Sequence, residues 1–286
     1  MAKKLILPIE IAQEIVNLYQ GGLSTIKIGK QYKLSPMYVN KLLRFNDVHI
    51  KTYLEINRKH PVNDNYFSVI NTEEKAYFLG FLFSDGNVSS KSNAITLKLQ
   101  KKDKEILVRF SHIILNKEKL HDSENNYVLK FSSKSVKDDL IRHGCMPNKT
   151  FKITFPTIDP TLYNHFIRGY FDGDGSIYSY KTDYNLNIIS TNVFCHSINQ
   201  IIFDLFSIAG GVDQSVAGLK RGNTITSTVG YGGNRRVALI MDWLYKDATI
   251  YLERKHDKYL ELKQLIKQVD DKCGNRYKRV RLDKHI

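Results

Sequence analysis

Hydrophobic positions in residues 1–48 recur at helical spacing and predict three short helices. In the stretch IEIAQEIVNLYQ, apolar residues at positions 11, 15, 18 and 19 fall on one helical face. Ser24 is placed to cap a second helix at its N-terminus. Ser35 followed by Pro36 begins a third helix, PMYVNKLLRF. This helix is expected to bury Val39, Leu42 and Leu43.

A tight turn before the third helix is typical of a helix-turn-helix, in which the helix after the turn enters the DNA major groove. The segment GLSTIKIGKQYKLSPMYVNKLLR resembles the helix-turn-helix of resolvases and transposases. We therefore predict a small all-α DNA-binding domain over residues 1–48, with a generic three-helix bundle as the alternative. The side chains expected to contact DNA are Ser35, Tyr38, Asn40, Lys41 and Arg44. Residues 49–70 show little periodicity and are predicted to be a linker.

From about residue 71 the chain repeats itself. The segments EEKAYFLGFLFSDGNVSS and YNHFIRGYFDGDGSIYS each contain an apolar helical run, then an acid, then glycine. Each is followed by strand, amphipathic helix, strand and closing helix patterns. The sequence predicts an α+β fold of two αββαββα repeats, over residues 71–157 and 158–268. Residues 269–286, which end in CGNRYKRVRLDKHI, are predicted to be a basic tail.

The predicted strands alternate between apolar and polar residues, which indicates sheets with one buried and one exposed face. In SNAITLKLQ, Ile95, Leu97 and Leu99 are expected to face the core. The opposite faces of both repeats would present amines, amides and hydroxyls that can bond to base edges and phosphates. The residues predicted to contact DNA there are Thr96, Lys98, Lys130, Ser132, Lys181, Asn185, Asn187 and Arg221.

Charge narrows the choice of partner. The 286 residues contain 43 Lys and Arg against 29 Asp and Glu, a net charge of +14. Such a surplus repels itself unless a polyanion meets it, which favours nucleic acid first and an anionic membrane surface second. No run of 18 apolar residues exists to span a bilayer. The three cysteines, Cys145, Cys195 and Cys273, form neither a disulfide framework nor a zinc set.

Small residues recur on the first helix of each repeat. Ala76, Gly80 and Ser84 lie four residues apart and form one stripe, and the second copy has Gly169 and Gly173 at the matching offsets. Such stripes let two helix backbones approach closely. The glycines that follow each acid, Gly86 and Gly175, are expected to end both helices.

If the two helices pack in parallel, Asp85 and Asp174 meet at the same end. Two carboxylates at the negative ends of two helix dipoles are unfavourable unless cations compensate them. An all-oxygen site with few protein ligands favours Mg²⁺, and a shared-metal site suits in-line attack on a phosphodiester.

The segments FLGFLFSDG and IRGYFDGDG resemble the two motifs of the LAGLIDADG homing endonucleases, and the similarity extends over about residues 71–262. The resemblance implies saddle-shaped antiparallel sheets and metal binding by Asp85 and Asp174. It further implies metal contacts from the backbone carbonyls of Ser84 and Gly173. Basic residues near the site would be Lys149 and Lys255, and polar residues ending the second strands would be Gln100 and Ser190. Phe83 departs from the family's usual acid at that motif position, which Asp172 retains.

The sequence therefore predicts a monomeric, site-specific homing endonuclease with two or more Mg²⁺ ions, for which Mn²⁺ would substitute. It would make a double-strand break in a long asymmetric site of double-stranded DNA and leave short 3′ overhangs. Two alternatives stay open: a transcription regulator that binds DNA without cutting, and a maturase that assists splicing of intron RNA. The expected location is the cytoplasm of a bacterial or phage-infected cell, with an organelle left open.

Overall fold

The computed structural model describes residues 7–50, 61–217 and 224–273, and divides into two compact units, Met1–His60 and Pro61–Ile286. In the first unit, the described residues 7–50 form the helices α1 (Ile9–Gln20), α2 (Thr25–Tyr32) and α3 (Pro36–Phe45). Ser24 and Ser35 cap α2 and α3 by accepting hydrogen bonds from Lys27 N and Tyr38 N. The buried hydrophobic side chains described in this unit are Ile15, Val16, Ile28, Val39 and Leu43, while Leu42 is only half-buried.

The second unit contains both repeats, as the sequence predicts. The first consists of α5 (Glu73–Ser84), β1 (Gly86–Val88), β2 (Ala94–Gln100), η1 (Lys101–Asp103), α6 (Lys104–Leu115), β3 (Leu120–Ser123), β4 (Asn126–Ser132), α7 (Lys134–Arg142) and η2 (Lys149–Phe151). The second consists of η3 (Pro160–Leu162), α8 (Tyr163–Asp174), β5 (Gly175–Tyr180), β6 (Asp183–Ser190), α9 (Asn192–Phe206), β7 (Gly211–Ala217), β8 (Thr224–Gly232), α10 (Asn234–Leu244) and α11 (Glu253–Cys273).

Each repeat builds one four-stranded antiparallel sheet of the same topology, ordered β1-β2-β4-β3 and β5-β6-β8-β7. The predicted alternation is confirmed, because Ile95, Leu97 and Leu99 of β2 are buried and Lys98 is exposed. In β6, Leu186 and Ile188 are buried on one face of the strand, and Asn185 and Asn187 lie on the other face. One hydrophobic core runs through both repeats, so they fold as a single unit.

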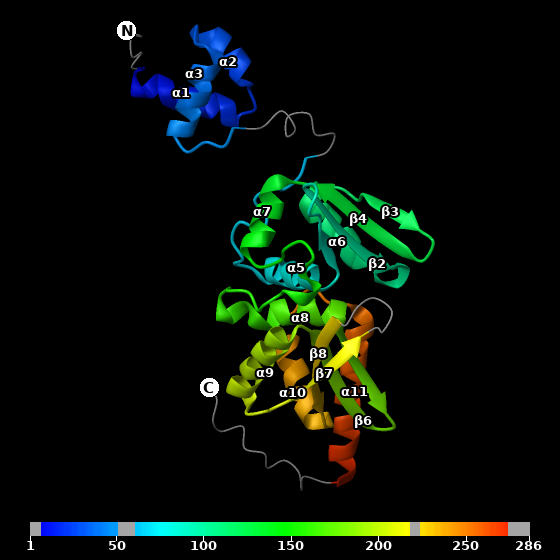
Figure 1. Ribbon diagram of the computed structural model, residues 1–286. Helices are drawn as coiled ribbons and strands as arrows, with labels where there is room; N and C mark the ends of the chain where they lie inside the picture. The colour runs from blue at the N-terminus through cyan, green and yellow to red at the C-terminus, as the bar shows by residue number, and fades with distance from the viewer. Residues whose placement is uncertain (1–6, 51–60, 218–223, 274–286) are drawn as a thin grey trace. The chain divides into compact units, whose positions relative to one another are not determined.

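Helices α5 and α8 lie side by side between the two halves of this unit (Figure 1). A Cβ on Gly80 would lie 2.0 Å from the carbonyl oxygen of Phe166, and one on Gly169 would lie 2.0 Å from that of Tyr77. A Cβ on Gly173 would in turn meet Ser84. Because the contacts advance along both helices in the same direction, the helices are parallel and their C-termini coincide. The stripe of small residues therefore permits the close approach that the sequence predicts.

Gly86 and Gly175 follow the ends of α5 and α8, as the sequence predicts. Each begins a strand, and Gly175 has an extended backbone, with φ −97° and ψ 165°. A Cβ on Gly86 would lie 2.5 Å from the carbonyl oxygen of Leu82, and one on Gly175 would lie 2.6 Å from that of Phe171. Glycine is needed because the chain passes from helix to strand against the last helical turn.

The predicted linker is wrong in its second half. Tyr66, Phe67 and Ile70 are buried in the core of the second unit, and the ring of Phe67 packs edge-on against that of Phe110. Residues 61–70 therefore belong to that unit, although their polar cluster and lack of periodicity resemble a linker.

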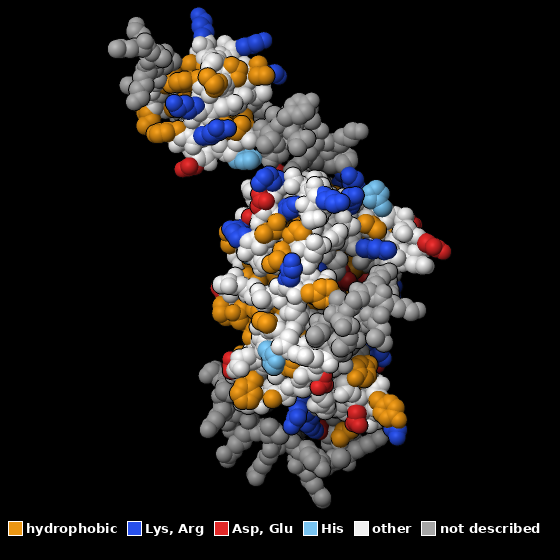
Figure 2. Space-filling view, viewed as in Figure 1, with side chains coloured by type: hydrophobic (Ala, Val, Ile, Leu, Met, Phe, Trp, Pro, Cys, Tyr) orange, Lys and Arg blue, Asp and Glu red, His pale blue; other side chains and the backbone are white. Residues whose placement is uncertain are grey.

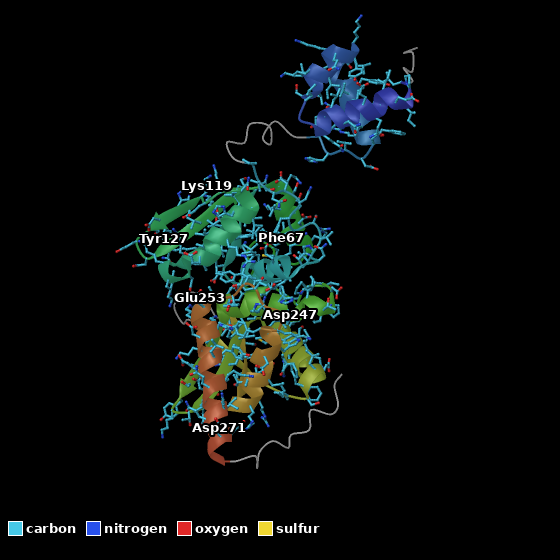
Figure 3. All side chains as sticks on the ribbon, turned by 180° about the vertical axis from the view of Figure 1, so that it is seen from behind. Phe67, Lys119, Tyr127, Asp247, Glu253 and Asp271 are labelled. Atoms are coloured by element: carbon cyan, nitrogen blue, oxygen red, sulfur yellow. The ribbon has the colours of Figure 1, made fainter. Side chains whose placement is uncertain are left out.

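The long C-terminal helix α11 was not predicted from the sequence. It runs from Glu253, level with the helix pair, to Asp271 at the far end of the second half (Figure 3), and it continues to Cys273. The start of the predicted basic tail, residues 269–273, is therefore helical, and residues 274–286 lie outside the described residues. Across the described ranges, no helix is long and apolar enough for a bilayer span.

Candidate active site

Asp85 and Asp174 occupy the coinciding C-termini of α5 and α8, directly before the first strand of each sheet. Both side chains are exposed to solvent, and a Cβ on Gly173 would lie only 3.0 Å from Oδ2 of Asp85. Desolvation by the surrounding protein and then the charge of Asp174 raise the pKa of Asp85 to about 6. The structure thus brings together the two acids that the sequence singles out, one from each repeat.

Desolvation also raises the pKa of the Asp174 carboxyl, while Lys149 and Lys255 lower it. The two carboxylates and nearby helix-end carbonyls offer oxygen ligands alone, which hard divalent cations such as Mg²⁺ prefer. Among the residues that the structure describes, no group of three or more His, Cys, Asp or Glu side chains could hold a metal ion. Two carboxylates supply few protein ligands, so the donor set fits a cation that keeps water or substrate oxygens in most of its coordination shell.

Lys149 and Lys255 are buried at the ends of the two helices, 8% and 4% exposed. Nζ of Lys149 donates to the carbonyl oxygen of Ser84 at 2.6 Å. Nζ of Lys255 donates to the carbonyl oxygens of Asp172 at 2.9 Å and Gly175 at 2.7 Å, and also to that of Phe171. Both ammonium groups thus sit where the helix dipoles are negative.

Burial lowers the pKa of both lysines, that of Lys255 to about 8. Their positive charges lower the pKa of Asp85 in turn. The backbone carbonyl of Ser84, which the resemblance assigns to a metal, accepts a hydrogen bond from Lys149 in this structure. The metal contacts of the Ser84 and Gly173 carbonyls stay predictions.

Gln100 and Ser190 end β2 and β6, the second strands of the two repeats, as the sequence predicts, but they do not occupy equivalent positions in the register. Gly86 pairs with Leu97 and Gly175 pairs with Ile188, so the equivalent of Ser190 is Leu99 and that of Gln100 is Thr191. Gln100 is exposed at the end of β2. Ser190 is 6% exposed and its Oγ lies 2.9 Å from the hydroxyl of Tyr170. Tyr170 lies between Ser190 and Asp174, and sequence reasoning missed it.

A buried polar network at the helix interface was also missed. Arg168 is fully buried and donates to Glu73 at 2.6 Å and to the carbonyl oxygens of Leu244 and Ile250. Asp172, the acid of the second motif that Phe83 replaces in the first, accepts from Tyr77 at 2.8 Å and from the backbone N–H of Leu252 at 2.9 Å. The sequence signal for this network was the presence of two charged residues, Arg168 and Asp172, in an otherwise largely apolar helix.

The outer faces of the two sheets carry most of the residues predicted to contact DNA. Lys98, Lys130 and Ser132 of the first sheet are exposed, as is Lys181 in the turn between β5 and β6, while Thr96, Asn185 and Asn187 are half-buried. Figure 2 shows lysine and arginine side chains spread over the first repeat of the second unit. Arg221 lies outside the described residues.

The second sheet has features that sequence reasoning did not select. Tyr178, Tyr180 and Ile189 are 46%, 70% and 49% exposed. Asn187 donates to the hydroxyl of Tyr178 at 3.4 Å, and a Cβ on Gly230 would lie 2.9 Å from Oδ1 of Asn187. Gly230 therefore leaves room for the Asn187 amide to lie across the neighbouring strand.

In the first unit, the side chains of Lys41 and Arg44 are exposed on α3, and that of Ser35 accepts the capping hydrogen bond at its start. Tyr38 and Asn40 are half-buried. Oδ1 of Asn40 is buried without a hydrogen-bond partner, which differs from the expected orientation toward solvent. Lys41 and Arg44 are thus the more accessible of the five residues predicted to contact DNA.

No protein-family model matches the chain, and no curated protein matches it. Several solved structures are similar at low identity. The LAGLIDADG homing endonuclease I-GzeII in complex with its DNA target is 13% identical, with a TM-score of 0.46 over 69% of this chain and 91% of that one. I-SmaMI bound to cleaved DNA is 11% identical, with a TM-score of 0.47 over 72% of this chain and 93% of that one. I-LtrWI bound to target DNA is 12% identical, with a TM-score of 0.44 over 73% and 93%.

Proposed function

We propose that this protein is a site-specific DNA endonuclease. The observation that carries the proposal is the meeting of Asp85 and Asp174 at the ends of two parallel, glycine-packed helices. Each acid is followed at once by a strand whose sheet has a polar outer face. A pair of solvent-exposed acids flanked by two such sheets suits a substrate that is long, polar and anionic.

Double-stranded DNA is the substrate that best fits the surface. The net charge of +14 favours a polyanion, and the outer faces offer amines, amides and hydroxyls rather than a broad apolar patch. The first sheet presents Lys98 and Lys130, while the second presents Asn185, Asn187 and the exposed Tyr178. Because the two faces differ in chemistry, the preferred DNA site is asymmetric.

Asp85 and Asp174 would hold divalent cations, with Mg²⁺ as the physiological ion and Mn²⁺ as a substitute. A bound cation would activate a water molecule and stabilise the leaving oxygen of a phosphodiester. Lys149 and Lys255 help to keep the acids ionised through their positive charges. The exposed amide of Gln100 is placed to bond to solvent at the end of β2.

Two acids from two repeats match two scissile phosphates, one on each strand. A single chain with this internal pseudo-symmetry needs no second subunit, so the enzyme acts as a monomer and leaves short 3′ overhangs. The first unit would add DNA contacts outside the central site through Lys41 and Arg44. The enzyme would also act in the homing of an intron, would bind intron RNA, and would act in the cytoplasm.

Selection of cleaved sequences from a randomised DNA library tests the function. Purified protein with Mg²⁺ is expected to enrich one long asymmetric site, cut on both strands. Ca²⁺ in place of Mg²⁺ is expected to allow binding of the same DNA without cutting. Binding of one specific site without cleavage in Mg²⁺ or Mn²⁺ would instead indicate a transcription regulator.

A further inference from the structure

The two repeats differ in chemistry one helical turn before each acid. Phe81 and Tyr170 each lie four residues before their acid, and the strand register makes Leu99 the equivalent of Ser190. The Asp85 half therefore has a phenylalanine and a leucine at these two positions. The Asp174 half has two hydroxyl groups there instead. Both members of the pair change together, which points to a joint role.

The two hydroxyls contact one another beside Asp174. Tyr170 is 1% exposed, and its hydroxyl lies 2.9 Å from Oγ of Ser190 and 3.1 Å from the carbonyl oxygen of Ile189. Residues four apart lie on the same face of a helix, so Tyr170 and Asp174 are neighbours. Desolvation raises the pKa of the Asp174 carboxyl, and Lys149, Lys255 and the nearby Tyr170 hydroxyl lower it. The single proton of that hydroxyl can turn from the oxygens of Ser190 and Ile189 toward the carboxylate. Ser190 can donate its own proton to the Tyr170 oxygen, since a hydroxyl both donates and accepts.

We propose that Tyr170, supported by Ser190, is a positioning residue that orients Asp174 toward a divalent cation, so that the two halves of the active site are unequal. The proposal rests on the proposed nuclease function. Phe81 and Leu99 cannot supply an equivalent hydrogen bond to Asp85. Asp174 therefore holds its cation in a more fixed geometry, and the two DNA strands are cut at different rates.

The first test compares wild type with Tyr170→Phe on the selected DNA site. Each strand carries its own fluorescent label, and both strands are followed in single-turnover reactions. For the wild type we expect a nicked intermediate to accumulate, because one strand is cut faster. Tyr170→Phe should slow cutting of one strand by about tenfold or more, since it removes a hydrogen bond to a charged group, while the other strand changes by less than about twofold. Equal slowing of both strands, or no change, would overturn the proposal.

The second test measures cation binding without DNA. Free Mn²⁺ is followed by electron paramagnetic resonance while the protein is titrated, and Tyr170→Phe should bind Mn²⁺ more weakly than wild type. Tyr231→Phe is the matched control, because it removes the hydroxyl of another buried tyrosine of the second repeat, one in β8 that bonds to Asn199. The control should bind Mn²⁺ like wild type. If both variants bind equally, Tyr170 does not act on Asp174.

The two tests separate failure of this proposal from failure of the nuclease function. A wild-type protein that cuts no DNA contradicts the nuclease function, and the Mn²⁺ titration then decides the role of Tyr170 alone. A wild-type protein that cuts, with a Tyr170→Phe variant unchanged in strand preference and Mn²⁺ affinity, contradicts only the positioning role. Ser190→Ala should weaken Mn²⁺ binding in the same direction but less, because it acts through Tyr170.

Discussion

Gly80 of α5 lies directly against the backbone of Phe166 in α8, where a Cβ would come within 2.0 Å of the carbonyl oxygen. The clash is with backbone, so no side chain can move aside to relieve it. Gly80→Ala should push the two helices apart and lower the free energy of unfolding by at least about 2 kcal/mol. Chemical denaturation measures this change.

The matched control for Gly80→Ala is Gly211→Ala in β7, where a Cβ would meet nothing within 4 Å. We expect this variant to stay within about 0.5 kcal/mol of wild type. Equal stability of Gly80→Ala and wild type would contradict the close packing of α5 on α8, and with it the placement of the two acids.

Removing the charge of Asp85 should stabilise the metal-free protein at neutral pH. The pKa of Asp85 rises from 3.8 when unfolded to about 6 when folded, so its ionisation opposes folding above that range. Because the carboxylate is solvent-exposed, the effect is screened, and Asp85→Asn should gain about 1 kcal/mol at pH 7.5.

The stability difference between Asp85→Asn and wild type should depend on pH in one direction. The advantage of Asp85→Asn over wild type should be absent below pH 3.8, grow as pH rises to about 6, and stay constant above it. Thermal melting of both proteins in a chelator across this range measures it. An advantage that shrinks as pH rises would show that neither desolvation nor the charge of Asp174 opposes ionisation of the Asp85 carboxyl.

The buried ion pair between Arg168 and Glu73 should be costly to break. Glu73 accepts from Arg168 at 2.6 Å and from the backbone N–H of Thr249 at 2.7 Å. Glu73→Gln removes the carboxylate that is bonded directly to the fully buried guanidinium, and should lower the free energy of unfolding by about 3 kcal/mol. Asp138→Asn, which breaks an exposed pair with Lys134, is the control and should cost less than about 0.5 kcal/mol. Similar losses for both variants would contradict the role of Arg168.

DNA binding should weaken steeply with salt, because lysines that contact phosphates release counterions. The double variant Lys98→Gln, Lys130→Gln should reduce the slope of log affinity against log salt by about 0.9 for each lysine that no longer neutralises a phosphate. Fluorescence anisotropy on the selected site measures the slope. Lys258→Gln, on α11 and paired with Glu261, is the control and should leave the slope unchanged. An unchanged slope in the double variant would remove the first sheet from the DNA surface.

The sequence predicts the repeats and the pair of acids well because both depend on local patterns. The alternation in β2 identifies the buried face of that strand. The spacing of the glycines identifies the packing face of each helix, with Gly80 in α5 and Gly169 and Gly173 in α8. A motif that occurs twice also restricts how two helices can pack. These features are visible in short windows of the chain, so the structure agrees with them.

The rest depends on contacts between distant segments. Glu73 and Arg168 are 95 residues apart, and nothing near either residue identifies the other. The one-residue offset between Gln100 and Ser190 is not visible in the sequence, because strand ends do not fix the pairing register, which hydrogen bonds to β1 and β5 determine. Tyr170 was missed for the same reason, since its partner Ser190 comes from a different element.

The proposed function requires that Asp85 and Asp174 together perform metal-dependent cleavage of DNA. Its most direct test is cleavage of the selected site in Mg²⁺ by wild type, Asp85→Asn and Asp174→Asn, with affinity for the same DNA measured in parallel. We predict that each variant loses double-strand cutting while it binds the site as tightly as wild type. Double-strand cutting by both variants at the wild-type rate would show that the two acids are not the metal-binding residues of a nuclease.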